Sequence, residues 1–297
     1  MEQVYACSIH LRKEIEMNNI QKSKTSAREL NRQIEQHLEE LAQATDKART
    51  SEEMLRYLDF CAKFHHYSAG NIWLILLAKP DATHVAGFHK WKSMGRWVRN
   101  GEHGIPILAP ILVKDENEDS VEKKHLVGFK TVYVFDVSQT DGDPLPPIPE
   151  WKSPEKNEEL NQRLIHFARG QGISVSFNNL NSDAQGVSKG GEIIIDPSAG
   201  TKTLIHEIAH ELMHKDENNI QSRATKELEA ESVAFIVSKH FRLECLNSPN
   251  YIALHGNDAK DIIASMDRIV KTAYEIIEFV EGKLNSDKFN EQTKVCA

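Results

Sequence analysis

Hydrophobic residues recur every three to four positions in several segments of the chain, the spacing that gives an α-helix one apolar face. This pattern predicts helices that include residues 30–41, 54–60 and 157–170, and a long helix over residues 258–281. Capping boxes, Ser26 with Glu29 and Thr50 with Glu53, predict where the first two helices begin. The apolar run 72–78 fits either a buried helix or a buried strand.

Segments rich in β-branched residues predict strands between these helices. Residues 105–113 and 126–137 flank the charged loop 114–124, so we expect them to pair as an antiparallel hairpin. Residues 173–177 alternate between apolar and polar, and residues 186–196 combine glycine turns with a short apolar strand. The later strands predict a small sheet directly before the helix that carries the most informative motif.

That motif lies in residues 203–214, where His206 and His210 are four positions apart. On a helix this spacing places both imidazoles on one face and about 6 Å apart along the axis, close enough to bind one zinc ion. Glu207 lies beside them, where it can contact a water molecule at the metal. The order histidine, glutamate, two spacers, histidine (HExxH) is the signature of zinc peptidases, in which the glutamate is the general base.

A catalytic zinc site needs a third protein ligand, and the acidic helix that follows supplies the candidates. Glu227 and Glu231 share one face, whereas Glu229 points about 200° away from Glu227. We assign Glu227 as the third ligand and Glu231 as the carboxylate that orients a ligand histidine, with the reverse order as the alternative. His214 lies about 12 Å from His206 along the helix, too far to share the ion.

Residues 206–210 followed by residues 227–231 resemble the metallopeptidases of mobile genetic elements, the ImmA/IrrE-like and ArdC antirestriction families. In these families the first glutamate of the second motif is a metal ligand, which supports Glu227 in that role. The resemblance covers roughly residues 160–255. It implies a zincin-like metallopeptidase domain with a small sheet beside the HExxH helix.

The site predicts a hydrolytic mechanism. Zinc held by the two histidines and Glu227 would activate a water molecule and polarise a peptide carbonyl, while Glu207 accepts the proton. A group that stabilises the transition state is also needed. Tyr251 is our candidate for this role, and His255 is the alternative, because both follow the second metal helix.

A second informative region lies between residues 63 and 107, which hold six lysines or arginines but only two acids. Three of the chain's four tryptophans lie in the same interval. Cations that follow phosphates and rings that stack on bases are typical of proteins that bind single-stranded nucleic acid. Buried tryptophans and a solvated basic surface are the competing interpretation. The residues that we expect to contact DNA are Lys90, Trp91, Lys92, Arg96, Trp97 and Arg99.

Short motifs in and after this region resemble the N-terminal single-stranded-DNA-binding domain of ArdC-type antirestriction proteins. They lie at residues 67–71, 88–91, 95–107 and 132–140, so the resemblance covers roughly residues 30–145. It implies an α+β domain with single-stranded DNA as its partner. Together with the metallopeptidase domain, it predicts a two-domain α+β fold.

Composition sets the remaining expectations. A formal net charge of −8 argues against strong nonspecific binding to duplex DNA. The four cysteines lack CxxC spacing, which argues against a disulfide framework and against a sulfur-bound zinc. The sequence contains neither an apolar run of membrane-spanning length nor a signal-peptide pattern, so we expect a cytoplasmic protein with no membrane partner.

A proline-rich stretch predicts a linker between the two domains, because proline has no N–H group to donate to a strand ladder. The expected order is an N-terminal arm (1–25), the DNA-binding domain (26–140), the linker (141–152), the metallopeptidase domain (153–285) and a tail (286–297).

Two functions remain open at this level. The first is a zinc endopeptidase that cleaves a protein such as a repressor or another regulator and is brought to single-stranded DNA by its N-terminal domain. The second is a non-proteolytic antirestriction protein that protects incoming DNA, with a structural or vestigial zinc site. The intact Glu207 favours the first function, because a structural zinc site needs no general base.

Overall fold

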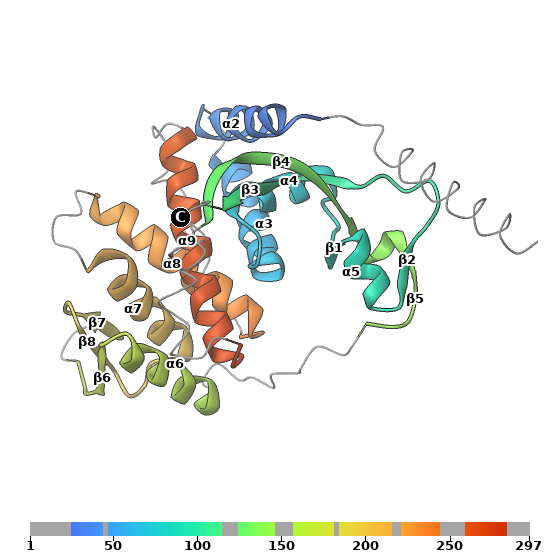
Figure 1. The fold of residues 1–297 in the computed structure, drawn as a ribbon. Helices are drawn as coiled ribbons and strands as arrows, with labels where there is room; N and C mark the ends of the chain where they lie inside the picture. The colour runs from blue at the N-terminus through green and yellow to red at the C-terminus, as the bar shows by residue number, and fades with distance from the viewer. Residues whose placement is uncertain are drawn as a thin grey trace, which may run out of the picture. The chain divides into compact units, whose positions relative to one another are not determined.

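The computed structural model describes residues 25–43, 47–114, 124–145, 157–180, 184–215, 221–243 and 259–283. Its helices and small sheets form a mixed α+β fold that divides into two compact units (Figure 1). Unit 1 combines Met1–Gln36 with Trp73–Pro147, and unit 2 combines His37–Ile72 with Ile148–Ala297. The expected division at a single linker therefore differs from the observed one, because residues 37–72 group with the C-terminal part of the chain.

Unit 1 is built on a three-stranded antiparallel sheet of order β1-β4-β3. Strands β3 (Ile105–Lys114) and β4 (Lys124–Asp136) form the predicted hairpin, and β1 (Val85–Gly87) pairs with the end of β4. Strand β4 is long and strongly curved (Figure 1). The register of the hairpin shifts between Ile111 and Leu112, and such an irregularity bends a strand ladder.

Short elements lie before and after the β3–β4 hairpin within unit 1. They are α5 (Phe88–Ser93), β2 (Arg96–Val98), the 3-10 helix η1 (Val137–Gln139) and β5 (Thr140–Gly142). The Asp136 carboxylate fixes the start of η1, because it accepts hydrogen bonds from the backbone N–H groups of Thr83, His84 and Ser138 at 2.8–3.0 Å. Strands β2 and β5 pair antiparallel. Residues 141 and 142, expected in the linker, therefore belong to a strand, and most of the remaining linker lies outside the described residues.

Two helices lie at the sequence borders of the units. Helix α2 (Ala27–Gln43) begins where predicted, and the Glu29 N–H donates to Ser26 Oγ at 3.2 Å. Its expected apolar stripe is buried. Helix α4 (Ala69–Ala78) resolves the ambiguous run as a helix, which is apolar nearly all round and mostly buried.

Unit 2 combines five helices with a small sheet among its described residues. The helices are α3 (Lys47–Phe64), α6 (Glu158–Gly170), α7 (Thr201–His214), α8 (Arg223–His240) and α9 (Ala259–Val280). The sheet has the order β6-β8-β7, in which β6 (Ser174–Phe177) runs parallel to β8 (Glu192–Ile195) and β7 (Gly186–Ser188) runs antiparallel.

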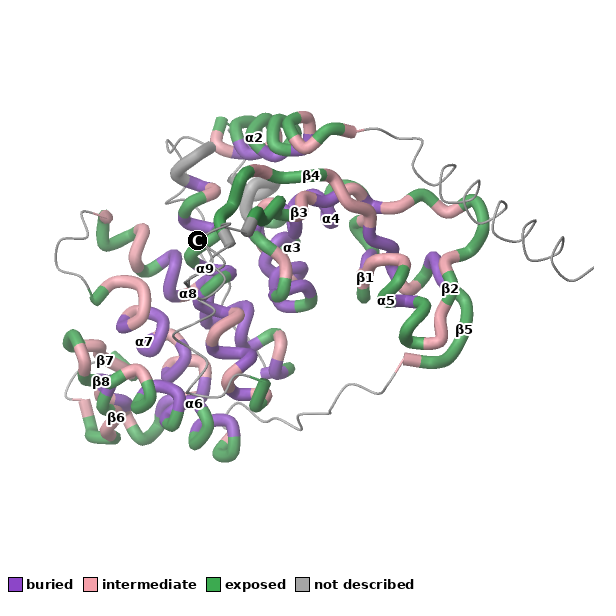
Figure 2. Tube along the Cα trace, viewed as in Figure 1, coloured by how far each residue is buried: buried purple, intermediate pink, exposed green. Residues whose placement is uncertain are grey.

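Helix α8 forms the centre of the core of unit 2 and packs against α3, α7 and α9. Its middle is buried on most sides (Figure 2), and Ala230 and Ala234 have no exposed surface, so neighbouring helices can approach closely. The apolar stripe predicted for α9, from Ile262 to Val280, is buried throughout. Burial of these stripes is the main stabilising contribution to unit 2.

Helix α3 explains why residues 37–72 belong to unit 2. It packs on α8, where Asp59 lies 3.4 Å from Lys239 and Ala62 O lies 3.1 Å from His240 Nδ1. The helix begins at Lys47, so the start predicted from Thr50 is wrong. Residues 47–49 continue the helix N-terminal to that capping signal, which local sequence alone did not reveal.

The described helices include none with the length and apolar character that crossing a membrane requires.

Candidate metal centre

Two helices of unit 2 supply the candidate metal ligands. Helix α7 carries His206 and His210, and α8, which packs against it, carries Glu227. The side of α7 formed by Leu204, Ile205, Ile208 and Ala209 is buried, as its helical spacing predicted. At the start of α8, the Thr225 N–H donates to Ser222 Oγ at 3.1 Å, and this cap fixes the helix start one turn before Glu227.

Three ligand atoms meet in a small triangle. The Nε2 atoms of His206 and His210 are 3.0 Å apart, and Glu227 Oε2 lies 3.6 Å from the first and 3.5 Å from the second. A triangle with these sides has a point about 2.0 Å from every corner, which matches the bond lengths of zinc to histidine and carboxylate. The residues therefore fit a divalent metal ion, and the donor set of two imidazoles and a carboxylate suits zinc.

The electrostatics of the two histidines differ. Burial, reinforced by the neighbouring His206, lowers the pKa of His210 to about 4, so the His210 imidazole is neutral near pH 7 and has a lone pair to share. Burial also opposes the charged form of His206, but the carboxylates of Glu231, Glu207 and Glu227 outweigh it and raise the His206 pKa. The site thus concentrates negative charge around one imidazole, which favours a bound cation.

Glu231 lies behind His206, in the position predicted for an orienting carboxylate. Its Oε2 is 3.3 Å from His206 Nδ1, and its Oε1 receives a short contact from the Lys202 ammonium. Burial would raise the pKa of Glu231, but the hydrogen bonds from His206 and Lys202 outweigh burial and lower it. An ionised Glu231 holds the His206 ring with its Nε2 lone pair directed at the triangle.

Glu207, the predicted general base, is buried beside the triangle. Burial is the main cause that raises the pKa of its carboxyl, and a backbone hydrogen bond from Ser188 opposes the shift. Strand β7 passes directly over it, since a Cβ on Gly186 would lie 2.7 Å from Glu207 Cγ. A carboxyl with a raised pKa near a metal site can accept a proton and deliver it to a leaving group.

Two further glutamates of these helices support the site without facing it. Glu229 is completely buried and contacts Ser265 Oγ at 2.7 Å, the Arg268 guanidinium and His214 Nε2 at 3.6 Å, so it is not a ligand of the triangle. Glu211 accepts hydrogen bonds from the N–H groups of Gly190 and Gly191 at 2.8 and 2.5 Å. Sequence reasoning missed Glu211, although its position four residues after Glu207 on α7 was a usable signal.

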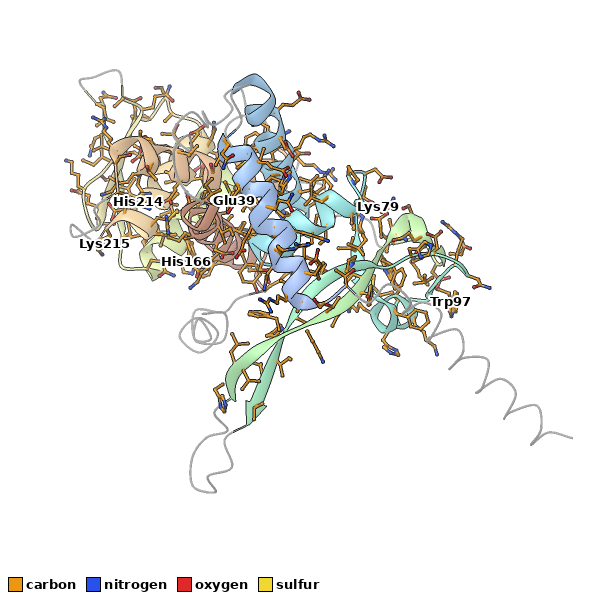
Figure 3. All side chains as sticks on the ribbon, turned by 90° about the horizontal axis from the view of Figure 1, so that it is seen from above. Glu39, Lys79, Trp97, His166, His214 and Lys215 are labelled. Carbon is orange, nitrogen blue, oxygen red and sulfur yellow. The ribbon has the colours of Figure 1, made fainter. Side chains whose placement is uncertain are left out.

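The six residues predicted to contact DNA differ in exposure and in their contacts within unit 1. Lys90 and Lys92 on α5 are exposed, and Trp97 on β2 is 56% exposed (Figure 3). Trp91 is only 2% exposed, and its Nε1 donates to Phe135 O at 2.8 Å. The prediction that Trp91 stacks on DNA is therefore corrected, because its indole belongs to the core of unit 1.

The two arginines of this set are already engaged inside unit 1. Arg96 donates to Thr140 Oγ1 at 2.8 Å and to Thr140 O at 3.0 Å. Arg99 pairs with Glu102 at 2.7 Å and donates to Ser138 O at 2.6 Å. These contacts hold β2 beside the turn around η1, so the arginines first serve the fold of unit 1. The predicted stabiliser Tyr251 and its alternative His255 lie outside the described residues.

Comparison with known proteins identifies one part of the chain. Residues 24–135 match the family model of the N-terminal domain of the anti-restriction factor ArdC. An uncharacterized protein of Bacillus anthracis is 28% identical over an alignment 326 residues long, which covers 88% of this chain and 55% of that protein. The chain thus spans about half the length of the curated relative that it matches.

Two crystal structures of the antirestriction ArdC protein from plasmid R388 are also similar. The metal-free structure has 20% identity and a TM-score of 0.45, and the alignment covers 73% of this chain and 85% of ArdC. The Mn(II)-bound structure has 17% identity and a TM-score of 0.44, with coverage of 75% and 84%.

The family match confirms the predicted resemblance of the N-terminal region to the ArdC N-terminal domain. It ends at residue 135, before the metal triangle. The metallopeptidase resemblance of the C-terminal region, and the role of each triangle residue, therefore remain predictions that rest on the motif and the geometry.

Proposed function

We propose that this chain is an antirestriction-type protein that binds single-stranded DNA through its ArdC-like N-terminal domain. The match of residues 24–135 to the N-terminal domain of the anti-restriction factor ArdC carries the proposal. The exposed cations Lys90 and Lys92 and the exposed ring of Trp97 support it, because α5 and β2 are neighbours within unit 1. Such a surface can bind phosphates and stack a base.

The DNA-binding proposal is tested by the affinity of the full-length chain for a fluorescent single-stranded oligonucleotide at several salt concentrations. Loss of two phosphate contacts in the Lys90→Gln/Lys92→Gln variant should reduce the slope of log affinity against log salt by about 1.4. Trp97→Ala should weaken binding by about 1–3 kcal/mol. Lys271→Gln and Phe177→Ala change an exposed cation and an exposed ring of unit 2 and serve as matched controls. Equal affinity and equal salt slopes in all variants would contradict the proposal.

Antirestriction itself is tested by the transfer of unmodified plasmid DNA into a restricting host. Expression of the protein should raise the transfer efficiency toward that of a non-restricting host. The lysine and tryptophan variants should lose this protection in proportion to their loss of DNA affinity. Protection that is independent of DNA affinity would show that the N-terminal domain acts in another way.

A second function is favoured by a separate observation, the convergence of three metal-ligand atoms beside a buried glutamate. We propose that unit 2 is a metal-dependent hydrolase that cleaves peptide bonds. A divalent ion at the triangle supplies a Lewis acid that polarises a carbonyl and lowers the pKa of a water. His206, His210 and Glu227 hold that ion, with zinc as the expected metal.

The chain's own residues provide the proton transfers and the substrate contacts. Glu207 takes a proton from the attacking water and passes it to the leaving amine, and its raised pKa suits both steps. Strand β7 is an edge of its sheet and lies against α7. An extended peptide can add to such an edge by main-chain hydrogen bonds. A repressor or another regulator is the class of protein substrate that we propose.

Two measurements separate the hydrolase from a protein that only binds DNA. Elemental analysis should find one metal ion fewer in His206→Ala and in Glu227→Ala than in the wild type, and reconstitution with zinc or manganese decides which ion binds more tightly. The plasmid-transfer assay should then be repeated with Glu207→Gln. Full protection by that variant would mean that antirestriction does not need hydrolysis. Loss of protection with unchanged DNA affinity would mean that antirestriction requires the hydrolase as well as DNA binding.

A further inference from the structure

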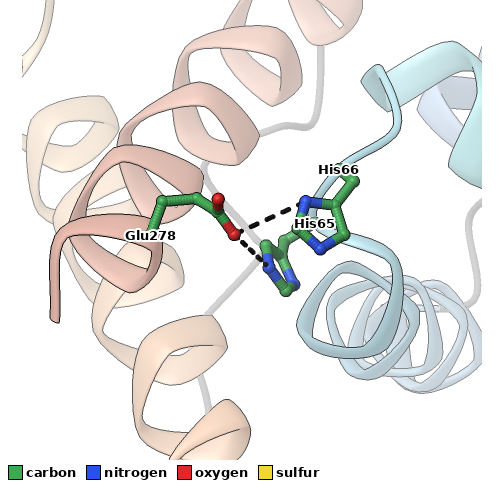
Figure 4. A group of neighbouring side chains, drawn as sticks. All are labelled: His65, His66 and Glu278. Carbon is green, nitrogen blue, oxygen red and sulfur yellow. Dashed lines mark ion pairs between the residues drawn. The ribbon is translucent and has the colours of Figure 1, made fainter. Parts of the chain in front are cut away.

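A second group of metal-type side chains lies in unit 2, in the turn after α3. His65 and His66 follow the last residue of that helix, and Glu278 is on the facing helix α9 (Figure 4). One carboxylate atom, Glu278 Oε1, lies 3.5 Å from His65 Nε2 and 3.6 Å from His66 Nδ1. The two imidazole centroids are 4.0 Å apart. Two rings therefore converge on one oxygen atom.

Burial makes this arrangement unusual. The side chains of His65 and Glu278 are only 5% and 9% exposed. Among the described residues, neither ring nitrogen of His65 has a hydrogen-bond partner, and Glu278 Oε1 has long contacts of 3.5–3.6 Å with His65, His66 and Lys283. Buried polar atoms without partners destabilise a fold by about 1–3 kcal/mol each, so such atoms call for a ligand or another explanation. A bound cation would satisfy Glu278 Oε1 and the His65 nitrogen that faces it, Nε2.

We propose that His65, His66 and Glu278 form a second divalent-metal site of zinc type, which fastens the turn after α3 to helix α9. The ligand atoms lie within 4.8 Å of one another, so small side-chain rotations would bring them around one ion. Two imidazoles and one carboxylate are a zinc donor set. The His66 side chain is 51% exposed, which gives an ion and a coordinating water a route to the site.

The surroundings of this site indicate a structural role. Glu281 is the other carboxylate nearby, and it pairs with His240 at 2.9 Å and with Lys283 at 2.5 Å. Among the described residues, no carboxylate beside the cluster is thus left to act as a base in the way that Glu207 can. The metal would join residues that are more than 200 positions apart in the chain, and binding to the folded state alone would raise the melting temperature.

Zinc stoichiometry after equilibrium dialysis of the full-length protein tests the proposal. We expect two zinc ions in the wild type, one in His66→Ala, one in His206→Ala/His210→Ala, and none in the triple variant. His66 is half-exposed, so its replacement should spare the fold, and circular dichroism of each variant checks this. His166→Ala, which removes another exposed histidine of unit 2, is the matched control and should keep both ions.

This set of variants tests the two proposed metal sites separately. If the triangle of α7 and α8 binds no metal, the wild type holds one zinc ion and His66→Ala holds none. If the second site is wrong, His66→Ala and Glu278→Gln keep the wild-type stoichiometry and affinity. Loss of a ligand should otherwise weaken zinc binding at least about tenfold, as even the loss of a neighbouring carboxylate does at known sites.

Lys283 separates a metal site from a simple ion-pair cluster, because its Nζ lies 3.6 Å from Glu278 Oε1 and competes with a cation there. The Lys283→Gln variant should bind zinc at least as tightly as the wild type. Zinc binding that is lost in Lys283→Gln but kept in His66→Ala would overturn the assignment of this cluster as a metal site.

Discussion

The triangle on α7 and α8 and the cluster between α3 and α9 consist of the same residue types, two histidines and one glutamate, but they are built differently. The histidines of the triangle are one helical turn apart on α7, and the Glu227 side chain is 51% exposed. His65 and His66 are adjacent in a turn, and their glutamate is buried. Each cluster therefore has one half-exposed side chain, the Glu227 carboxylate in the triangle and the His66 imidazole in the second cluster.

The neighbours of the two clusters differ as well. Beside the triangle, Glu207 is buried and is the proposed base, and Glu231 Oε2 lies 3.3 Å from His206 Nδ1. Beside the second cluster, Glu281 pairs with both His240 and Lys283, and Lys283 also lies 3.6 Å from Glu278 Oε1. The proposed difference in role, catalysis at the triangle and stability at the second cluster, therefore rests on the residues around the ligands. The following variants test this difference, from the largest expected effect to the smallest.

Glu207→Gln should have the largest effect. Loss of the general base is expected to lower peptide hydrolysis by about 10²–10⁴-fold, because a glutamine cannot accept a proton. The triangle ligands are unchanged, so the metal content should stay at the wild-type value. Mass spectrometry of a peptide mixture measures cleavage, and elemental analysis measures the metal. Undiminished cleavage would exclude Glu207 from the reaction.

Gly186→Ala should lower hydrolysis by up to about 10²-fold without loss of metal, because a misplaced catalytic group costs about that much. A Cβ at this position would lie 2.7 Å from Glu207 Cγ and 2.8 Å from Glu207 Oε1, so the carboxyl must move. Gly128→Ala is the matched control, since Gly128 is also in a strand and nothing lies near its Cβ position. A wild-type rate in Gly186→Ala would mean that Glu207 tolerates displacement.

Glu231→Gln should weaken metal affinity at the triangle about 10–100-fold, because His206 loses the charged partner that orients its ring. Metal titration with a competing chelator measures the change. The exposed residue Glu192 provides the control variant Glu192→Gln, which should bind metal normally. Normal metal affinity in Glu231→Gln would mean that Glu231 does not orient His206 and serves mainly to pair with Lys202.

Glu281→Gln should show how much the ion pairs beside the second cluster contribute to the free energy of unfolding. The hydrogen bond from His240 is the main cause that lowers the pKa of Glu281 to about 2, with Lys283 adding to it against burial. Because the folded pKa lies below the unfolded one, the stabilisation is present above about pH 4.5 and is lost as the pH falls toward 2. The variant should be about 2 kcal/mol less stable at pH 7, and equal to the wild type near pH 2.

Denaturant unfolding at several pH values measures that difference. Glu275, on the same helix, gives a control of opposite sign, because burial raises the pKa of its carboxyl. Its ionisation opposes folding, so Glu275→Gln should not destabilise the protein at pH 7. A constant difference between Glu281→Gln and the wild type at all pH values would mean that packing, rather than charge, explains the effect.

Local patterns predicted the regular elements well where both a period and a boundary signal were present. The buried stripe of α9, the hairpin β3–β4 and the Ser26 cap were all readable from neighbouring residues. The helix start predicted from Thr50 is wrong, because α3 starts three residues earlier at Lys47. The apolar run in α4 could not be assigned locally, because a wholly buried helix and a buried strand have the same composition.

Side-chain roles that depend on burial were harder to predict. Trp91 and Trp97 both looked like stacking residues, yet one indole is in the core and the other is exposed. Arg96 and Arg99 looked like free cations, but they donate hydrogen bonds to Thr140 and Ser138, in and beside η1. The deciding partners lie about 40 residues away in sequence, beyond the reach of any local pattern.

The sequence by itself predicted the candidate metal triangle, because helical spacing brings His206 and His210 onto one face and narrows the third ligand to Glu227 or Glu231. Tertiary structure decided the partition of the chain into units and the meeting of His65 and His66 with Glu278. A helix repeats every 3.6 residues, so short-range order is encoded in spacing. Contacts between distant segments depend on how buried faces pack together, which no short stretch of sequence specifies.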